Sequence, residues 1–225
     1  MTAELPRNRG LVKICGLREP EHASIAAAQG ADLIGFIFAP SRRQITPEHA
    51  RRCIEMARSS AIAPLLAVGV FVNATAEEIA DTVARSGIDV VQLHGKELPS
   101  FSEQVAAPTL RAYSPPPDSG LAETETHLRG FRAGSKPPLA LLLDGYHPGG
   151  SGGAGVRADW AMAAELATRL PIILAGGLDP MNVAEAIRKV HPLGVDVSSG
   201  VETDGIKDPA KIETFIANAR TAFAD

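Results

Sequence analysis

Cysteine, aromatic residues and long apolar stretches are all scarce in this sequence. Only two of the 225 residues are Cys, which excludes a disulfide framework. Aromatic residues make up 4%, so the core must be aliphatic and rich in Ala. No apolar stretch reaches the roughly 18 residues that a membrane span needs, so we expect no membrane association.

The charge is also modest, at a net −4. Nucleic-acid binding depends on neutralising phosphates with basic side chains, so this balance argues against a nucleic-acid partner. A small anionic substrate remains compatible with it, because local Arg side chains and backbone amides can oppose the overall sign.

Recognisable cofactor and metal motifs are missing as well. The six His are dispersed, and neither a His-x-Glu nor a Cys-x-x-Cys spacing occurs. The sequence has no Walker-type loop and no dinucleotide fingerprint. We therefore expect a reaction without a metal or another cofactor.

The first ten residues, 1–10, are polar and contain no apolar signal region. We interpret them as a short flexible extension and expect a cytoplasmic protein. A chain of this length can bury one good core. No linker interrupts it, so residues 1–225 are predicted to form a single domain, as a monomer or a homodimer.

Short apolar runs alternate with helix-like segments along the whole chain. Eight apolar runs are expected as strands, at residues 11–15, 33–38, 65–72, 90–94, 109–113, 139–144, 171–175 and 195–198. Eight helices are expected between and after them, at 20–29, 47–58, from 73 or 75 onward, 99–105, 121–131, 159–169, 180–190 and 209–223.

This alternation favours a closed (β/α)8 barrel, with units of about 25 to 30 residues each. The uninterrupted apolar run 139–143 is typical of a parallel strand that is buried on both faces. An open doubly wound sheet is the alternative, but that fold usually has its phosphate-binding turn after the first strand. Here the glycine-bearing strand ends follow the seventh and eighth runs, where barrels commonly bind phosphate.

The first run ends in Cys15, at the position where barrel enzymes carry catalytic residues. Lys13 lies two positions earlier, so its side chain points to the same face. A nearby ammonium group can lower the thiol pKa towards neutrality and yield a thiolate base. Alternatively, Cys15 is an inert buried residue and Lys13 pairs with a carboxylate inside the barrel.

Two aspartates stand at or near the ends of later runs. Asp144 follows five apolar residues, where a carboxylate needs a partner or a chemical task. It can act as an acid or cap the following turn. Asp196 lies within the eighth run and is expected either to pair with Lys13 or to accept a substrate hydroxyl.

The seventh and eighth runs end in residues that expose backbone amides. Gly176 and Gly177 follow the seventh run, and Ser199 and Gly200 follow the eighth. Such loops form anion-binding nests, and a short helix beginning after Gly200 would add its dipole. Plain tight turns are the alternative.

Further candidates lie at the ends of the second, fourth and sixth runs. Arg42 or Arg43 can bind a substrate carboxylate through two parallel hydrogen bonds, or both can belong to a solvated loop. His94 is expected at the rim, where it either binds substrate or covers the barrel mouth. The glycine-rich segment 149–155 reads as a lid or as a passive connector.

Several of these motifs, in this order, resemble phosphoribosylanthranilate isomerases of tryptophan biosynthesis. The resemblance covers residues 12–220. Its carrying segments are Lys-Ile-Cys-Gly-Leu at Lys13, Gly-Ala-Asp-Leu-Ile-Gly-Phe-Ile-Phe at Gly30, Ser-Arg-Arg at Ser41, Val-Gly-Val-Phe-Val-Asn at Val68, Val-Gln-Leu-His-Gly at Val91, Leu-Leu-Leu-Asp at Leu141, Leu-Ala-Gly-Gly-Leu at Leu174 and Gly-Val-Asp-Val-Ser-Ser-Gly-Val-Glu at Gly194.

The resemblance implies a cofactor-independent Amadori rearrangement of N-(5-phosphoribosyl)anthranilate to 1-(2-carboxyphenylamino)-1-deoxyribulose 5-phosphate. It assigns the general acid to Asp144 and the general base to Cys15. By the same correspondence, Arg43 would hold the anthranilate carboxylate, and the amides around Gly177 and its neighbours on the eighth strand would hold the phosphate. The loop 38–43 is one residue shorter than the family pattern, so Arg42 remains an alternative to Arg43.

Two other functions compete with this interpretation. An indole-glycerol-phosphate synthase would need catalytic Lys and Glu at strand ends, and the histidine-pathway sugar isomerase would need aspartates on strands one and five. A non-catalytic barrel that senses a phosphorylated metabolite is the rival from another class. Such a sensor could keep the glycine loops but would need neither Cys15 nor Asp144.

Overall fold

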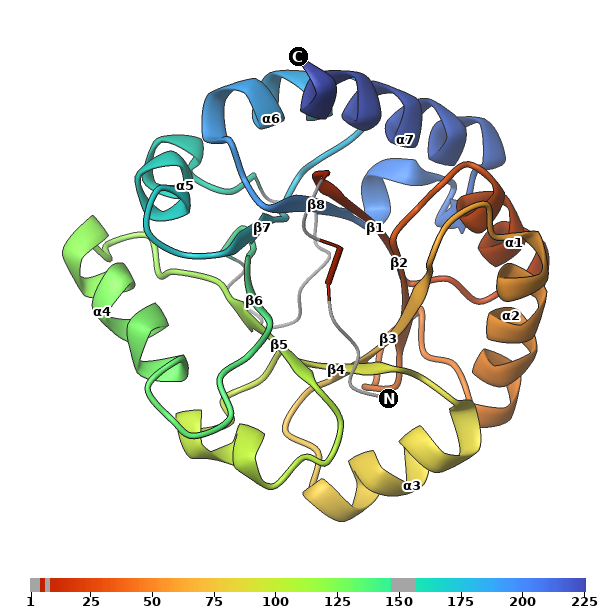
Figure 1. Cartoon of the computed structure of the whole chain (residues 1–225), viewed down its shortest axis with the longest axis horizontal. Helices are drawn as coiled ribbons and strands as arrows, with labels where there is room; N and C mark the ends of the chain where they lie inside the picture. Colours follow the sequence, from red (N-terminus) through yellow and green to blue (C-terminus); the bar gives the residue numbers. More distant parts are fainter. Residues whose placement is uncertain (1–4, 7–8, 147–156) are drawn as a thin grey trace.

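Eight parallel strands close into a barrel in the computed structural model, which describes residues 5–6, 9–146 and 157–225 (Figure 1). The strands pair in chain order, and β8 returns to pair with β1. This confirms the predicted (β/α)8 architecture. The strands are β1 (Leu11–Cys15), β2 (Leu33–Ile37), β3 (Leu66–Phe71), β4 (Val90–Leu93), β5 (Thr109–Tyr113), β6 (Ala140–Leu143), β7 (Ile172–Leu174) and β8 (Gly194–Val197).

The helices form a ring outside the strands, as Figure 1 shows. They are α1 (Pro20–Ala28), α2 (Pro47–Ser60), α3 (Ala76–Ser86), α4 (Leu121–Phe131), α5 (Trp160–Ala167), α6 (Val183–Val190) and α7 (Pro209–Ala224). Local sequence explains the starts of two of them. Thr46 accepts a hydrogen bond from the backbone of His49 at the start of α2, and Thr75 forms a capping box with Glu78 at the start of α3.

Two expected helices differ from the prediction. The segment after β4 is a short 3-10 helix, η1 (Pro99–Glu103), in place of the helix expected at 99–105. Helix α6 begins at Val183 instead of residue 180, because Asp179 and Asn182 bond each other's backbone N–H groups and hold a turn there.

The chain after β8 also differs from the expected helix following Gly200. A single turn of 3-10 helix, η2 (Ser199–Val201), is followed by the short antiparallel strands β9 (Glu202–Thr203) and β10 (Ile206–Lys207). The turn between these strands contains Asp204 and Gly205, both with positive φ. The described segment after β8 therefore lacks the helix whose dipole was expected to strengthen anion binding there.

Alternation along each strand divides the core into two layers. Val12 and Ile14 of β1 belong to the layer between strands and helices, whereas Leu11 belongs to the layer inside the barrel. Side chains of a strand point to opposite faces in turn, so Lys13 and Cys15 also point inward. The same alternation directs Gln92, Asp144 and Asp196 inward from β4, β6 and β8.

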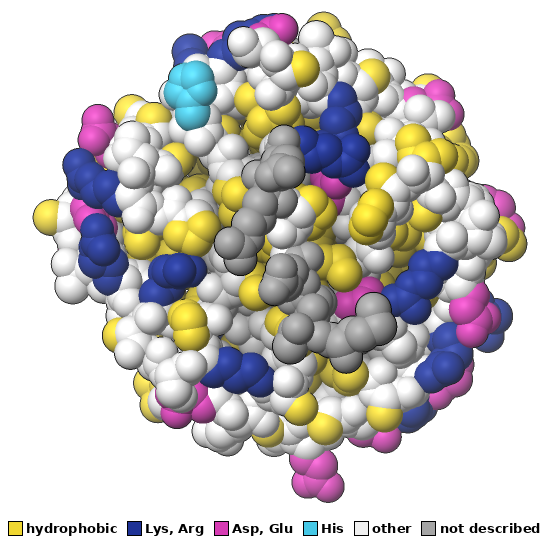
Figure 2. Space-filling model, in the orientation of Figure 1, with side chains coloured by type: hydrophobic (Ala, Val, Ile, Leu, Met, Phe, Trp, Pro, Cys, Tyr) yellow, Lys and Arg dark blue, Asp and Glu magenta, His cyan; other side chains and the backbone are white. Residues whose placement is uncertain are grey.

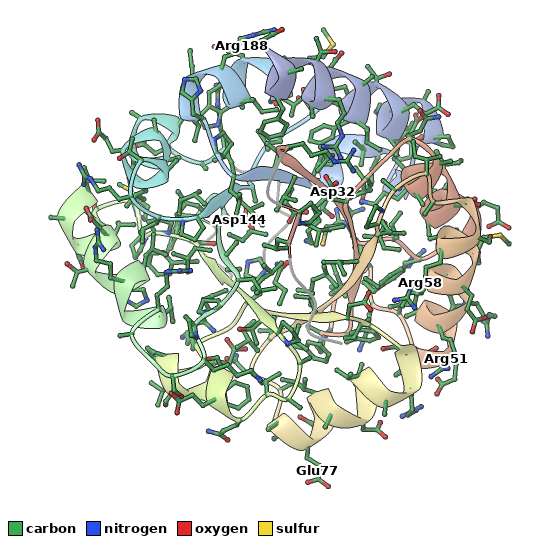
Figure 3. All side chains as sticks on the ribbon, in the orientation of Figure 1. Asp32, Arg51, Arg58, Glu77, Asp144 and Arg188 are labelled. Carbon is green, nitrogen blue, oxygen red and sulfur yellow. The ribbon has the colours of Figure 1, made fainter. Side chains whose placement is uncertain are left out.

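The opposite end of the barrel, where the strands begin, is held by a buried aspartate. Asp32 has no exposed surface and accepts hydrogen bonds from Arg9 at 2.7 Å, from Arg220 at 2.5 Å and from the backbone of Val12 at 2.8 Å. Figure 3 shows Asp32 inside the ring of helices, whereas Glu77 and Arg188 lie at its outer edge. Asp32 thus links Arg9 and helix α7 to the end of the barrel where the strands begin.

Part of the expected N-terminal extension, 1–10, lies outside the described residues. Of the part that is described, Leu5 packs against the layer inside the barrel and Arg9 pairs with Asp32. None of the described helices has the length and apolar character required to cross a membrane.

Replacing Asp32 with Ala should lower the free energy of unfolding by about 3 kcal/mol, because it leaves two arginines and a buried backbone N–H without their acceptor. Asp81→Ala is the matched control, since Asp81 is exposed and, among the described residues, its carboxylate pairs with Arg85 alone, at 2.8 Å. That control should change stability by less than about 0.5 kcal/mol. Urea denaturation measures both, and equal losses in the two variants would contradict the role given to Asp32.

Candidate active site

A hollow of about 800 Å³, counting the open space at its mouth, lies where the strands end. Seven of the eight strands, or the loops that follow them, contribute residues to its lining; β5 does not. The residues that the sequence singled out and that line it are Cys15, Arg43, His94, Asp144, Gly176, Gly177, Asp196 and Ser199. Lys13 lies beneath Cys15, and Gly200 lies outside the hollow.

Cys15 and its neighbours on β8 form the floor of this hollow. Lys13 of β1 is directly opposite Asp196 of β8, and Lys13 Nζ lies 3.0 Å from Asp196 Oδ1. Lys13 is fully buried, and Asp196 is the carboxylate partner that the sequence analysis left open for it. Gly35 lies opposite Cys15, and a Cβ there would approach Cys15 Sγ to 2.7 Å, so glycine leaves room for the thiol.

The pKa of Cys15 is raised above its ordinary value, contrary to the lowered pKa expected from the sequence. Burial is the largest cause; the Lys13 ammonium opposes it and the Asp196 carboxylate reinforces it. Burial likewise lowers the pKa of Lys13, but the Asp196 and Cys15 charges outweigh this, so that pKa is raised overall. The ammonium of Lys13 therefore favours the thiolate, as the sequence suggested, but burial of the thiol outweighs this effect.

Asp144 follows β6 on the far side of the same hollow and is 7% exposed. One carboxylate oxygen accepts the backbone N–H of Gly145 at 2.8 Å, and the other lies 3.5 Å from His94 Nε2. Figure 3 shows Asp144 within the ring of helices, on the barrel side. The carboxyl group is therefore positioned by both its own loop and the end of β4.

His94 is neutral at pH 7. Burial lowers its pKa to about 4, and the positive charges of Lys13 and Arg111 act in the same direction. Its other ring nitrogen, Nδ1, lies 3.3 Å from Nε2 of Gln92, which also points into the hollow. A neutral imidazole can donate or accept a hydrogen bond next to Asp144, but it adds no charge there.

The glycine loop after β7 has the backbone shape that an anion cradle needs. Gly176 and Gly177 have φ values of 82° and 64°, a backbone region that favours glycine. Among the described residues, no acceptor pairs with their N–H groups or with those of Ser199 and Gly200. A Cβ on Gly200 would approach the Leu178 carbonyl to 1.9 Å, so the two loops lie in close contact. Successive N–H groups of this kind bind anions.

Of the two candidate arginines, only Arg43 lines the hollow. Its side chain is 8% exposed, and it donates to Glu202 through Nε at 2.6 Å and Nη2 at 3.0 Å. Arg42 also binds Glu202, at 2.7 Å, but its side chain is 56% exposed. The geometry therefore favours Arg43 as the carboxylate ligand.

Sequence reasoning did not single out Glu202 or Lys207 as site residues. Lys207 is directly opposite Glu202 in the β9–β10 pair and donates to it at 2.9 Å and to the Ser198 carbonyl at 2.7 Å. The Asp-Gly pair at Asp204 signals a hairpin, and recognising it would have placed these two residues opposite each other.

Two further expectations concern residues around the hollow. The proposed lid, 149–155, lies outside the described residues. Among the residues that are described, no group of three or more His, Cys, Asp or Glu side chains is placed to hold a metal ion; the cofactor-free reaction stays a prediction.

In the space-filling view, basic and acidic side chains intermix around the periphery, so positive charge is not spread over this face (Figure 2).

Comparison with known proteins gives one consistent result. A family model described as N-(5'-phosphoribosyl)anthranilate isomerase matches residues 12–218. The N-(5'-phosphoribosyl)anthranilate isomerase of Roseiflexus castenholzii is 47% identical over 94% of this chain and 99% of its own length. Two crystal structures each cover 94% of this chain and 99% of their own at 35% identity. One has a TM-score of 0.77 and contains monomeric forms of the dimeric Thermotoga maritima enzyme. The other has a TM-score of 0.76 and contains a phosphoribosyl anthranilate isomerase in complex with reduced 1-(o-carboxyphenylamino)-1-deoxyribulose 5-phosphate.

The burial of His94 predicts an acid-sensitive contribution to stability. Its folded pKa of about 4 lies below the ordinary 6.5, so between these values the unfolded chain binds the proton and the folded chain does not. Unfolding is therefore favoured as the pH falls, by about 2 kcal/mol between pH 7 and pH 5. In urea denaturation at both pH values, His94→Gln should lose that much less stability than wild type. An identical pH dependence in both proteins would contradict it.

Proposed function

The chain belongs to the N-(5'-phosphoribosyl)anthranilate isomerase family and is an isomerase of tryptophan biosynthesis, and from this premise we propose that Cys15 and Asp144 carry its two proton transfers. The observation that carries the proposal is their placement. They point inward from the ends of β1 and β6 and line one hollow, with Arg43 and the glycine amides around the same space.

The substrate, N-(5-phosphoribosyl)anthranilate, has an anion at each end. Its aromatic carboxylate binds Arg43, and its phosphate binds the N–H groups around Gly177 and Ser199. The ribose between them then lies against Cys15 and Asp144. The structure of a relative in complex with a reduced product analogue supports a ligand of this chemistry in the barrel.

Asp144 acts first, as the general acid. It gives its proton to the ribose ring oxygen while the bond from that oxygen to C1 breaks. The nitrogen lone pair of the anthranilate forms a double bond to C1, so the product of this step is an open-chain Schiff base. His94 lies 3.5 Å from Asp144 and is neutral, so it places no positive charge beside the proton donor.

Cys15 acts second, as the general base. Its thiolate takes the proton from C2, and the electrons of that bond form the enolamine as nitrogen regains its lone pair. Protonation at C1, together with loss of the proton of the C2 hydroxyl, then gives the ketone. The reaction needs no oxidant or reductant, since atoms and electrons are only rearranged. We also propose that Asp196 accepts a substrate hydroxyl; its position in the lining of the hollow, with its charge balanced by Lys13, supports this role.

The assembly and location follow less directly. A relative from Thermotoga maritima is dimeric, so we propose a monomer or a homodimer for this chain. The cytoplasmic location stays a prediction, as does the single domain over residues 1–225.

Cys15→Ala and Asp144→Asn should each lower kcat/KM by about 100- to 10,000-fold, the range that a positioned proton donor or acceptor contributes. Freshly generated phosphoribosylanthranilate is fluorescent, and its disappearance measures the rate. Cys53→Ala is the matched control. Cys53 is buried in α2, where burial raises its pKa to about 12, and it does not line the hollow.

Each outcome of this assay has a distinct meaning. If wild type binds the phosphorylated ligand without consuming it, the chain is a sensor and the proposed function is wrong. If wild type turns over and the folded Cys15 and Asp144 variants keep full activity, only the assignment of residues is wrong. Loss in these two variants with activity kept in Cys53→Ala supports both.

The pH profile tests the base separately. Only a thiolate can take the C2 proton, and burial raises the Cys15 pKa above its ordinary value. The kcat/KM of wild type should therefore rise between pH 7 and pH 9, by up to about tenfold per pH unit. A profile that is flat over this range would show that a group other than Cys15 limits the reaction.

A further inference from the structure

Glu202 lies behind Arg43, outside the residues that line the hollow. Its two carboxylate oxygens accept four hydrogen bonds. Oε1 accepts from Arg43 Nε at 2.6 Å and Lys207 Nζ at 2.9 Å, and Oε2 accepts from Arg43 Nη2 at 3.0 Å and Arg42 Nη2 at 2.7 Å. The carboxylate is therefore saturated and has no capacity left for a ligand.

The charge of Glu202 is maintained by these partners. Burial alone would raise its pKa, but the hydrogen bonds and charges of Arg43 and Lys207 outweigh this and lower it to about 2. Glu202 is thus ionised at every pH at which the enzyme would work, and its side chain is only 5% exposed.

The contact with Glu202 leaves one edge of Arg43 available. A guanidinium group has five N–H donors, and Glu202 uses the one on Nε and one on Nη2. The remaining edge, formed by Nη1 and Nη2, can bind a second carboxylate through two parallel hydrogen bonds. Arg43 makes no other side-chain hydrogen bond to the described residues, so Glu202 alone fixes the plane of the guanidinium.

We propose that Glu202 is a positioning residue that makes the enzyme selective for an aromatic amine carrying a carboxylate, by aiming the free edge of Arg43 into the hollow. This rests on the proposed function, in which Arg43 binds the anthranilate carboxylate. The alternative is that Glu202 competes with the substrate for Arg43, in which case its removal would strengthen binding.

The hairpin gives Glu202 the rigidity that this task requires. Lys207 faces it across the β9–β10 pair, and Lys211 of α7 donates to the Glu202 carbonyl at 2.7 Å. Lys207 also donates to the Ser198 carbonyl, just before the phosphate-binding amides. Damage at Glu202 could therefore reach the phosphate site, and the test has to separate that effect from a loss at Arg43.

Two ligands provide this separation. One is reduced 1-(o-carboxyphenylamino)-1-deoxyribulose 5-phosphate, and the other is the same molecule made from aniline, which lacks only the carboxylate. Titration calorimetry gives Kd for each with wild type and Glu202→Gln. We expect Glu202→Gln to weaken the carboxylated ligand by about 10- to 100-fold, the scale of a misplaced binding group, and the other ligand by less than about threefold.

Glu125→Gln is the matched control. Glu125 also binds two arginines, Arg129 and Arg169, at 2.7 and 2.6 Å, but it lies on α4 and does not line the hollow. Its replacement should leave both Kd values unchanged. In Arg43→Lys, which lacks the fork, adding Glu202→Gln should cost no further affinity for the carboxylated ligand.

The outcomes separate the two levels of the argument. If wild type binds neither ligand, the proposed function is wrong. If wild type binds and Glu202→Gln weakens both ligands equally, leaves both unchanged or strengthens the carboxylated one, this inference alone is overturned. If Glu202→Gln does not fold, Glu202→Asp keeps the charge on a shorter side chain, and the same selective loss supports the proposal while a uniform loss overturns it.

Discussion

Closure of the barrel between β1 and β8 is the constraint on which the site depends. Parallel pairing places Lys13 opposite Asp196, and the strict alternation of side chains turns both into the barrel, where each balances the charge of the other. A shift of β1 by one residue would turn Lys13 and Cys15 away from the hollow and leave Asp196 without its ion-pair partner. The fold and the chemistry therefore require the same register.

Burial is the main reason why the thiol is not activated in the resting barrel; within the buried ion pair, Lys13 opposes this effect and Asp196 reinforces it. Removing two charges from water costs about as much as their attraction returns, so Lys13 and Asp196 add little net stability. Their effect is on Cys15, which lies next to an ammonium that is already balanced, and burial then dominates its pKa. The proposed base and acid thus begin in different environments. Cys15 is buried beside an ion pair, whereas Asp144 is hydrogen-bonded to its own loop at the rim.

The sequence predicted what depends on local pattern and failed where contacts over long distances decide. Alternating apolar runs gave all eight strands, and Thr46 and Thr75 marked two helix starts. The predicted direction of the Cys15 pKa was wrong because the largest cause of its shift is burial inside the closed barrel, which the neighbouring residues in the sequence do not reveal. Likewise Arg43 was a candidate from its position, whereas its fixation by Glu202, 159 residues away, required the fold.

In the proposed binding mode, the two ends of the substrate are bound by different physical means, although the chain as a whole is acidic. Glycine loops offer N–H groups that carry only partial charges, so a phosphate can bind there without a permanent cation and its desolvation cost. The carboxylate instead meets Arg43, whose full charge must be buried and therefore needs Glu202 behind it. Arg42 and Lys207 then leave the cluster with an excess of positive charge, since three cations surround one carboxylate. A local excess of this kind attracts a dianionic ligand to one side of the hollow, and the neutral His94 leaves the other side free for proton transfer.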